Sequence, residues 1–122
     1  MPEHIKIEKM EEVESYDHIL KLLENKASVK QQIFKTTSSV FNQFKVVLQE
    51  ICLDMQSDFS KIDQNVEISY SDRGDFEAQL KFSGDVLVLS MHSNVFSFPP
   101  EHEINKLKYV QEDTSRKYCG II

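Results

Sequence analysis

The residues best suited to chemistry in this sequence are two histidines and two glutamates around a Pro-Pro dipeptide. His92 precedes Pro99-Pro100, and His102 follows it with Glu101 and Glu103 on either side. Imidazole nitrogens and carboxylate oxygens are common ligands of zinc and iron in proteins. An enzyme or a metal-binding protein that uses His92 and His102 is therefore one hypothesis for the function.

The spacing of these residues argues against a preformed metal site. On a strand, the side chain of His102 would point to the face opposite Glu101 and Glu103. On a helix, three consecutive side chains diverge instead of converging on one point. The ten-residue interval between the two histidines lacks the short spacing of a preformed His pair. We expect no cofactor and no metal, and His92, His102 and Glu103 are the candidate ligands if a metal binds.

The other reactive side chains are explained by structural roles. Asp72, Asp75 and Asp85 fall in predicted turns, where an Asp side chain caps neighbouring backbone groups. Cys52 lies within a helical pattern and is expected in the core, and both Cys52 and Cys119 are expected to be reduced. The sequence has no nucleotide-binding, hydrolase or zinc-protease motif, and its three glycines form no phosphate-binding loop. These features favour a protein that is not an enzyme.

The charge of the chain disfavours two classes of partner. Fourteen Lys and Arg residues stand against twenty Asp and Glu residues, a formal net charge of −6, and no basic cluster reverses it locally. Such a surface repels phosphate backbones and anionic lipids, so we expect neither a nucleic-acid nor a membrane partner. The first residues carry charges where a signal peptide needs an apolar stretch, so we expect a cytoplasmic protein.

Two stretches in the first half have the apolar spacing of amphipathic helices. The first runs from about residue 11 to residue 24, with Asn25 as its expected end. The second begins at Ser28, which has capping-box spacing to Gln31, and continues for about seven turns. Both helices are expected to pack on a sheet or on each other.

The second stretch contains a row of apolar residues at seven-residue intervals: Phe34, Phe41, Leu48 and Met55. A packed core helix explains this row better than a coiled coil does, because the positions between hold Gln, Thr, Ser and Asn instead of paired charges. Helical dimerisation stays open as the alternative.

From residue 63 onward the apolar period changes to two, which is typical of strands. Residues 66–70 and 76–82 alternate between apolar and polar, and the short turns after them make neighbouring strands antiparallel. Residues 86–91 begin as an uninterrupted apolar run, which predicts a central strand buried on both faces.

Shorter elements follow this meander. We expect a strand at residues 95–98, after a bulge or turn at Asn94, and its pairing ends at Pro99-Pro100. Residues 107–110 have the composition of a further strand, and residues 111–117 that of a polar loop. Residues 118–122 form either a last strand or part of a longer protein cut at this point.

Four segments resemble a family of uncharacterised bacterial proteins of the kind found in Bacteroidetes. They are residues 70–82, 91–96, 101–103 and 118–122, and they lie within the last fifty or so residues. The resemblance implies a bacterial cytosolic protein whose chain normally continues past Ile122. It implies no activity, substrate or catalytic residue.

The sequence therefore predicts one α+β domain over residues 1–122, with two N-terminal helices on one face of an antiparallel β-meander of three to five strands. Its expected core is Phe34, Phe41, Phe44, Leu48, Ile68, Phe76, Leu80 and Val88. The candidate binding surface is His92, Asn94, Phe96 and His102. The leading hypothesis for the function is a non-enzymatic module that binds an unknown protein or small ligand. A homodimer, as a self-associating structural subunit, is the third hypothesis.

Overall fold

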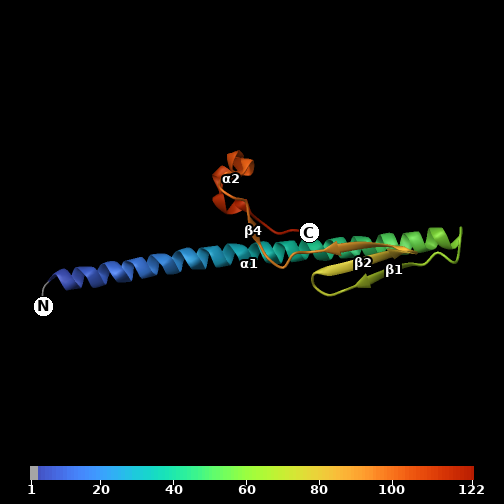
Figure 1. Ribbon diagram of the computed structural model, residues 1–122, viewed down its shortest axis with the longest axis horizontal. Coiled ribbons are helices and arrows are strands. Elements are labelled where there is room, and N and C mark those ends of the chain that lie inside the picture. The colour runs from blue at the N-terminus through green and yellow to red at the C-terminus, as the bar shows by residue number, and fades with distance from the viewer. Residues whose placement is uncertain (1–2) are drawn as a thin grey trace. The chain divides into compact units, whose positions relative to one another are not determined.

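The computed structural model describes residues 3–122 of the chain, with side chains from residue 12 onward. The chain divides into two units, Met1–Gln32 and Ile33–Ile122, and helix α1, Glu3–Ser60, contributes residues to both (Figure 1). In the first unit every side chain from residue 12 to residue 28 is exposed. These residues therefore build no core within their own unit.

One helix replaces the two that the sequence predicts. α1 continues through Asn25 and Ser28, so the predicted end at Asn25 and the predicted start at Ser28 are both wrong. The sequence has neither Gly nor Pro between residues 3 and 60, and Lys26 and Ala27 are good helix formers. A capping residue does not end a helix when helix-forming residues follow it directly, because each further residue adds a backbone hydrogen bond.

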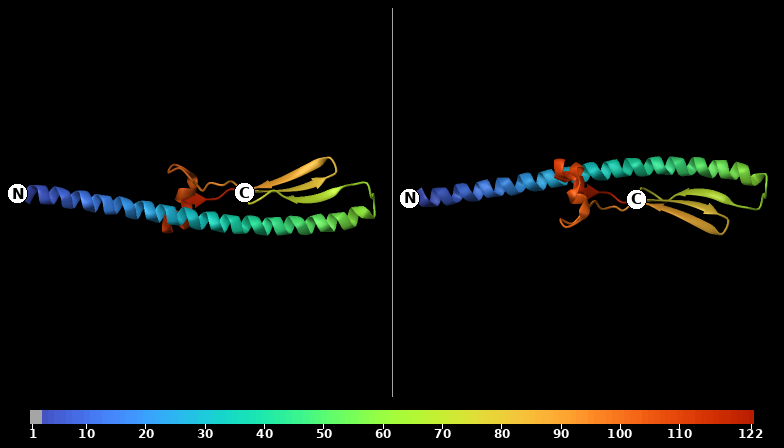
Figure 2. Two further views of the ribbon diagram at one scale, coloured as in Figure 1. Left: turned by 90° about the horizontal axis from the view of Figure 1, so that it is seen from below. Right: turned by 90° about the horizontal axis from the view of Figure 1, so that it is seen from above.

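The second unit contains an antiparallel sheet of three strands, as the sequence predicts. β1 (Ile68–Asp72), β2 (Glu77–Phe82) and β3 (Asp85–Ser90) lie in the order β1-β2-β3. The turn between β1 and β2 contains Gly74 at a φ of 106°, a backbone conformation that glycine adopts without steric cost. The three strands run alongside the C-terminal part of α1 in both views of Figure 2.

The core of the second unit lies between α1 and one face of this sheet. Its buried side chains are Leu48 and Cys52 from the helix and Ile68, Ala78 and Leu80 from the strands. Burial of a large apolar side chain of this kind contributes roughly 1.5–3 kcal/mol before the entropy cost is subtracted. Half-buried residues surround this cluster: Met55, Phe59, Val66, Tyr70, Phe82 and Leu89.

The prediction of the core is right for Phe41, Leu48, Ile68 and Leu80, which are buried. It is wrong for three others, because Phe44, Phe76 and Val88 are 40–49% exposed. Phe34 is half-buried, and its ring meets that of Phe76 edge-on with centroids 6.2 Å apart.

β3 is an edge strand and not the buried central strand that the sequence predicts. β2 occupies the centre, and Val86, Leu87 and Val88 are 49–51% exposed. Val88 lies opposite Gln79 and therefore on the sheet face away from the core. An uninterrupted apolar run has the same sequence signature whether or not the second face of the strand is covered, which explains the error.

A second, two-stranded sheet is formed by β4 (Phe96–Ser97) and β5 (Tyr118–Cys119), which pair antiparallel. Of the last strand predicted at residues 118–122, residues 118 and 119 are in β5. Between them lie η1 (Glu103–Lys106), α2 (Lys108–Glu112) and η2 (Thr114–Lys117).

The strand predicted at residues 107–110 is wrong, since these residues enter α2, and the polar loop predicted after it includes η2. Here Val110 is the buried residue, at 4% exposure, while Leu107 and Tyr109 are exposed. Within the described residues, no helix has the length and apolar character needed to cross a bilayer.

Candidate functional site

In the second unit, α1 carries two apolar rows, and only one of them is covered. The covered row contains Phe41, Leu48 and Cys52, which are at most 8% exposed. The other row, which we call the outer stripe, consists of Ile33, Val40, Phe44, Val47 and Ile51. Ile33 is half-buried, and the other four are 37–48% exposed.

The outer stripe remains exposed because a helix turns by about 100° per residue. Phe44 follows Phe41 by three residues, so its side chain lies about 60° around the helix from a residue that the sheet covers. Val40 and Val47 lie still further around. The predicted core contains residues of both rows, Phe41 and Phe44, but the combined width of the rows exceeds what one face of a three-stranded sheet covers. That excess width is the signal by which the outer stripe could have been found.

The C-terminal segment approaches α1 close to one end of the outer stripe. A Cβ added at Gly120 would lie 2.8 Å from Cβ of Thr37, so the backbone here is within contact distance of the Thr37 side chain. Thr37 is half-buried, and its hydroxyl donates to the carbonyl of Ile33 at 2.8 Å. The freest part of the stripe therefore runs from Val40 to Ile51.

A buried cation lies on α1 beside the covered row. Lys45 is 8% exposed, and its Nζ donates to Oδ1 of Asp72 at 2.9 Å and to the carbonyl of Gly74. The hydrogen bond from Lys45, together with one from the backbone N–H of Gly74, holds the pKa of Asp72 below its ordinary value. Because its hydrogen atoms are directed at these acceptors, Lys45 holds the β1–β2 turn against α1 and is not placed as a nucleophile or base. Its spacing of four residues from Phe41 and three from Leu48 places it on the covered side of α1, and this spacing is the sequence signal for its burial.

Three residues of the predicted binding surface do lie together. The ring of His92 meets that of Phe96 edge-on with centroids 4.7 Å apart, and Nδ1 of His92 accepts the backbone N–H of Asn94 at 3.1 Å. His92 thereby stabilises the bend that leads into β4, because an acceptor two residues back satisfies a free backbone donor.

His102, the fourth residue of that surface, has a similar local role at η1. Its Nδ1 accepts the backbone N–H of Ile104 at 3.1 Å, which caps η1, and its ring packs on that of Phe98 at a centroid distance of 4.7 Å. Glu103 lies in the first turn of η1. Among the residues whose side chains are described, no three His, Cys, Asp or Glu side chains gather closely enough to hold a metal ion.

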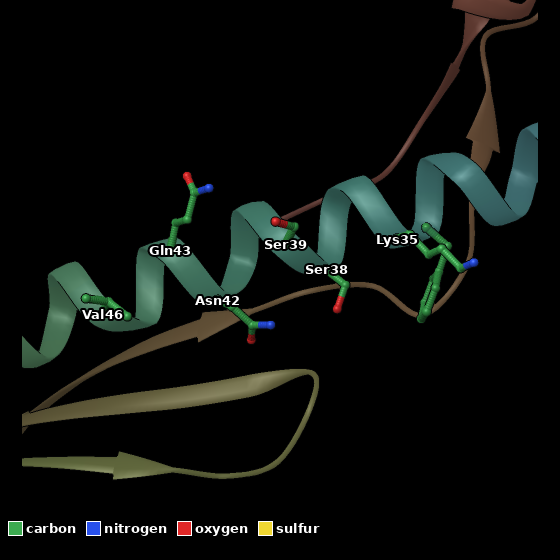
Figure 3. Close-up of a pocket in the computed structure, with 7 residues that line it drawn as sticks. Lys35, Ser38, Ser39, Asn42, Gln43 and Val46 are labelled. Atoms are coloured by element: carbon green, nitrogen blue, oxygen red, sulfur yellow. The ribbon is translucent and has the colours of Figure 1, made fainter.

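An open depression of about 500 Å³ lies along α1 (Figure 3). Its seven lining residues are Phe34, Lys35, Ser38, Ser39, Asn42, Gln43 and Val46. Ser38 and Asn42, one helical turn apart, point to the same side of the helix in Figure 3. Lys35 is the one ionisable side chain among these lining residues, which include no His, Cys, Asp or Glu.

Comparison with protein-family models, curated proteins and solved structures finds no match to this chain. The resemblance of its C-terminal part to a bacterial family therefore stays a prediction. Within the second unit, the outer stripe is a row of exposed apolar side chains at helical spacing.

Proposed function

We propose that this chain is a non-enzymatic, self-associating subunit that binds a second copy of itself through the outer stripe of α1. The observation that carries the proposal is the exposure of Val40, Phe44, Val47 and Ile51, each between 37% and 48%. Soluble monomers rarely leave a contiguous apolar surface of this kind in water, and such surfaces mark binding sites for other proteins.

The spacing along the stripe supports a helix as the occupant. Val40, Phe44, Val47 and Ile51 follow one another at intervals of four, three and four residues. This alternation repeats every seven residues and is the pattern by which two helices pack side chains between one another. Binding to a sheet edge or to a small ligand does not require this seven-residue spacing.

Mass measurement across a dilution series tests the proposal. We expect sedimentation equilibrium to give a dimer that dissociates with a Kd below about 100 µM. The triple variant Val40→Gln/Phe44→Gln/Val47→Gln should be monomeric throughout, with association weakened at least about tenfold. Gln is a good helix former, so α1 itself should persist, and far-UV circular dichroism checks this.

Two control variants make the test specific. Val46→Gln/Leu53→Gln removes exposed apolar side chains of α1 outside the outer stripe, and it should leave the dimer intact. Val86→Thr/Val88→Thr removes exposed apolar side chains of β3, an edge strand of the type that can pair with another strand. This variant should also leave the dimer intact. The proposal would be overturned if either control variant lost the dimer while the triple variant kept it. A wild-type protein that stays monomeric would also overturn it.

A further inference from the structure

We infer that the two copies of α1 pair antiparallel, centred on Asn42, so that Lys30 faces Asp54 and Lys26 faces Asp58 of the partner. The inference rests on the proposed self-association and adds the orientation, the register and the charged residues that select them.

The outer stripe defines two sets of inward-facing positions. In coiled-coil terms, Thr37, Phe44 and Ile51 occupy the a positions, and Ile33, Val40 and Val47 occupy the d positions. When two helices run antiparallel, an a residue of one helix packs beside a d residue of the other. The pairs that result depend only on the residue chosen as the centre.

With Asn42 at the centre, the outer stripe pairs with itself. Val40 meets Phe44 of the second copy, and by symmetry Phe44 meets Val40, which gives two central apolar layers. The next layers on each side pair Thr37 with Val47 and Ile33 with Ile51. Because Gly120 lies beside Thr37 and Ile33 is half-buried, these outer layers have less free surface than the central ones.

The same spacing, counted along the sequence of α1, leads to charged residues beyond both ends of the apolar layers. Asp54 and Asp58 follow at the next d and a positions, and Lys30 and Lys26 precede at the corresponding a and d positions. All four side chains are exposed, and none of the ion pairs found between described residues involves them.

These charges are complementary in one orientation only. About Asn42, Lys30 is symmetric with Asp54 and Lys26 with Asp58, so an antiparallel pair brings together four Lys–Asp pairs, two at each end. In a parallel pair in register each residue faces its own copy, which places Lys against Lys and Asp against Asp. Opposite charges at a and d positions select a partner and its orientation, and like charges exclude the alternative.

Charge reversal tests the orientation. Lys26→Glu/Lys30→Glu and Asp54→Lys/Asp58→Lys each turn four attractive pairs into repulsive ones, so each should weaken dimerisation about tenfold or more at low salt. The quadruple variant restores opposite charges at every pair and should return the Kd to within about threefold of wild type. Salt at about 1 M should reduce the differences, since it screens exposed charges.

A crosslinking experiment reads the register without relying on charge. In a Cys119→Ser background, in which Cys52 stays buried, Val40→Cys and Phe44→Cys chains of different tag length are oxidised alone and as a mixture. The antiparallel register predicts a mixed disulfide between position 40 of one chain and position 44 of the other. A parallel dimer would instead give disulfides within each single variant.

The outcomes separate this inference from the proposed function. Weakened double variants, a restored quadruple variant and a mixed disulfide support the antiparallel pair. A dimer that needs the outer stripe but is insensitive to the charge reversals and forms like-to-like disulfides overturns the inference and leaves self-association standing. A wild-type chain that is monomeric overturns both. Far-UV circular dichroism and urea unfolding of each variant verify that the fold is retained.

Discussion

Nζ of Lys45 lies 2.9 Å from Oδ1 of Asp72, a residue 27 positions further along the chain. The same ammonium group bonds the carbonyl of Gly74 and lies 5.1 Å from the centroid of the Phe41 ring. The lysine side chain is 10% exposed and the aspartate 54%. Lys45 is thus buried and Asp72 is exposed to solvent. Their ion pair holds the β1–β2 turn against α1.

Replacement of Lys45 by Met should lower the free energy of unfolding by about 1–2 kcal/mol. Met keeps the apolar stem of the side chain, but the carbonyl of Gly74 loses its donor. Urea denaturation at fixed protein concentration measures the loss. Lys81→Met is the matched control, because Lys81 and Glu67 form an exposed pair at 3.8 Å, and such pairs contribute about 0–1 kcal/mol. Equal losses in the two variants would contradict a special role for Lys45.

The pair with Lys45 should make stability depend on pH. The hydrogen bonds from Lys45 and from the backbone of Gly74 lower the pKa of Asp72 in the folded state below its ordinary value of 3.8. The folded protein therefore prefers the ionised carboxylate. The stability that this preference contributes is complete above pH 3.8 and is lost as the pH falls through the lowered pKa of the folded state.

Asp72→Asn tests this pH dependence. The variant should be less stable than wild type at neutral pH, and the difference should shrink as the pH falls below the ordinary pKa of the carboxyl group. Urea unfolding over an acidic pH series measures it, with Asp75→Asn in the same turn as the control. A difference that stays constant over the series would mean that ionisation of Asp72 does not contribute.

Truncation of Phe41 and truncation of Phe44 should affect different properties, although both residues belong to the apolar pattern of α1. Phe41 is 0% exposed, so Phe41→Ala should cost about 3–5 kcal/mol of unfolding free energy through lost burial and a cavity. Phe44 is 47% exposed, so Phe44→Ala should cost the monomer about 1 kcal/mol or less and act mainly on association. Urea unfolding at a protein concentration well below the dimer Kd measures the loss of unfolding free energy. Sedimentation measures the effect on association. Comparable losses in the monomer would mean that the covered row is misassigned.

Gly120 should tolerate no side chain in the arrangement seen here. The Cβ of Gly120→Ala would overlap the side chain of Thr37, and the C-terminal segment must then move away from α1. The backbone N–H of His92 donates to the carbonyl of Ile121 at 2.8 Å, so we expect this amide of His92 to exchange at least about tenfold faster in Gly120→Ala. Gly84→Ala is the control, since a Cβ there meets nothing within 4 Å. Unchanged exchange at His92 would show that the segment adapts without moving.

Features that depend on local periodicity can be predicted from the amino-acid sequence. The change of apolar period near residue 63 places the helix and the meander correctly, and the turns around Gly74 and Gly84 follow from the residues that such turns require. The buried row through Phe41 and Leu48 is also readable from its seven-residue spacing. The helix boundaries predicted at Asn25 and Ser28 are the exception, because a capping residue does not end a helix when helix-forming residues follow it directly.

Which apolar surfaces are covered depends on contacts between elements that are distant in the chain. Phe44 and Val88 have the same local pattern as Phe41 and Leu80, but burial depends on how far the sheet extends around α1 and on which strand lies at its edge. The burial of Lys45 depends likewise on Asp72, which is distant in sequence. Periodicity indicates that a residue lies on an apolar face. Whether that face is buried depends on which elements elsewhere in the chain contact it.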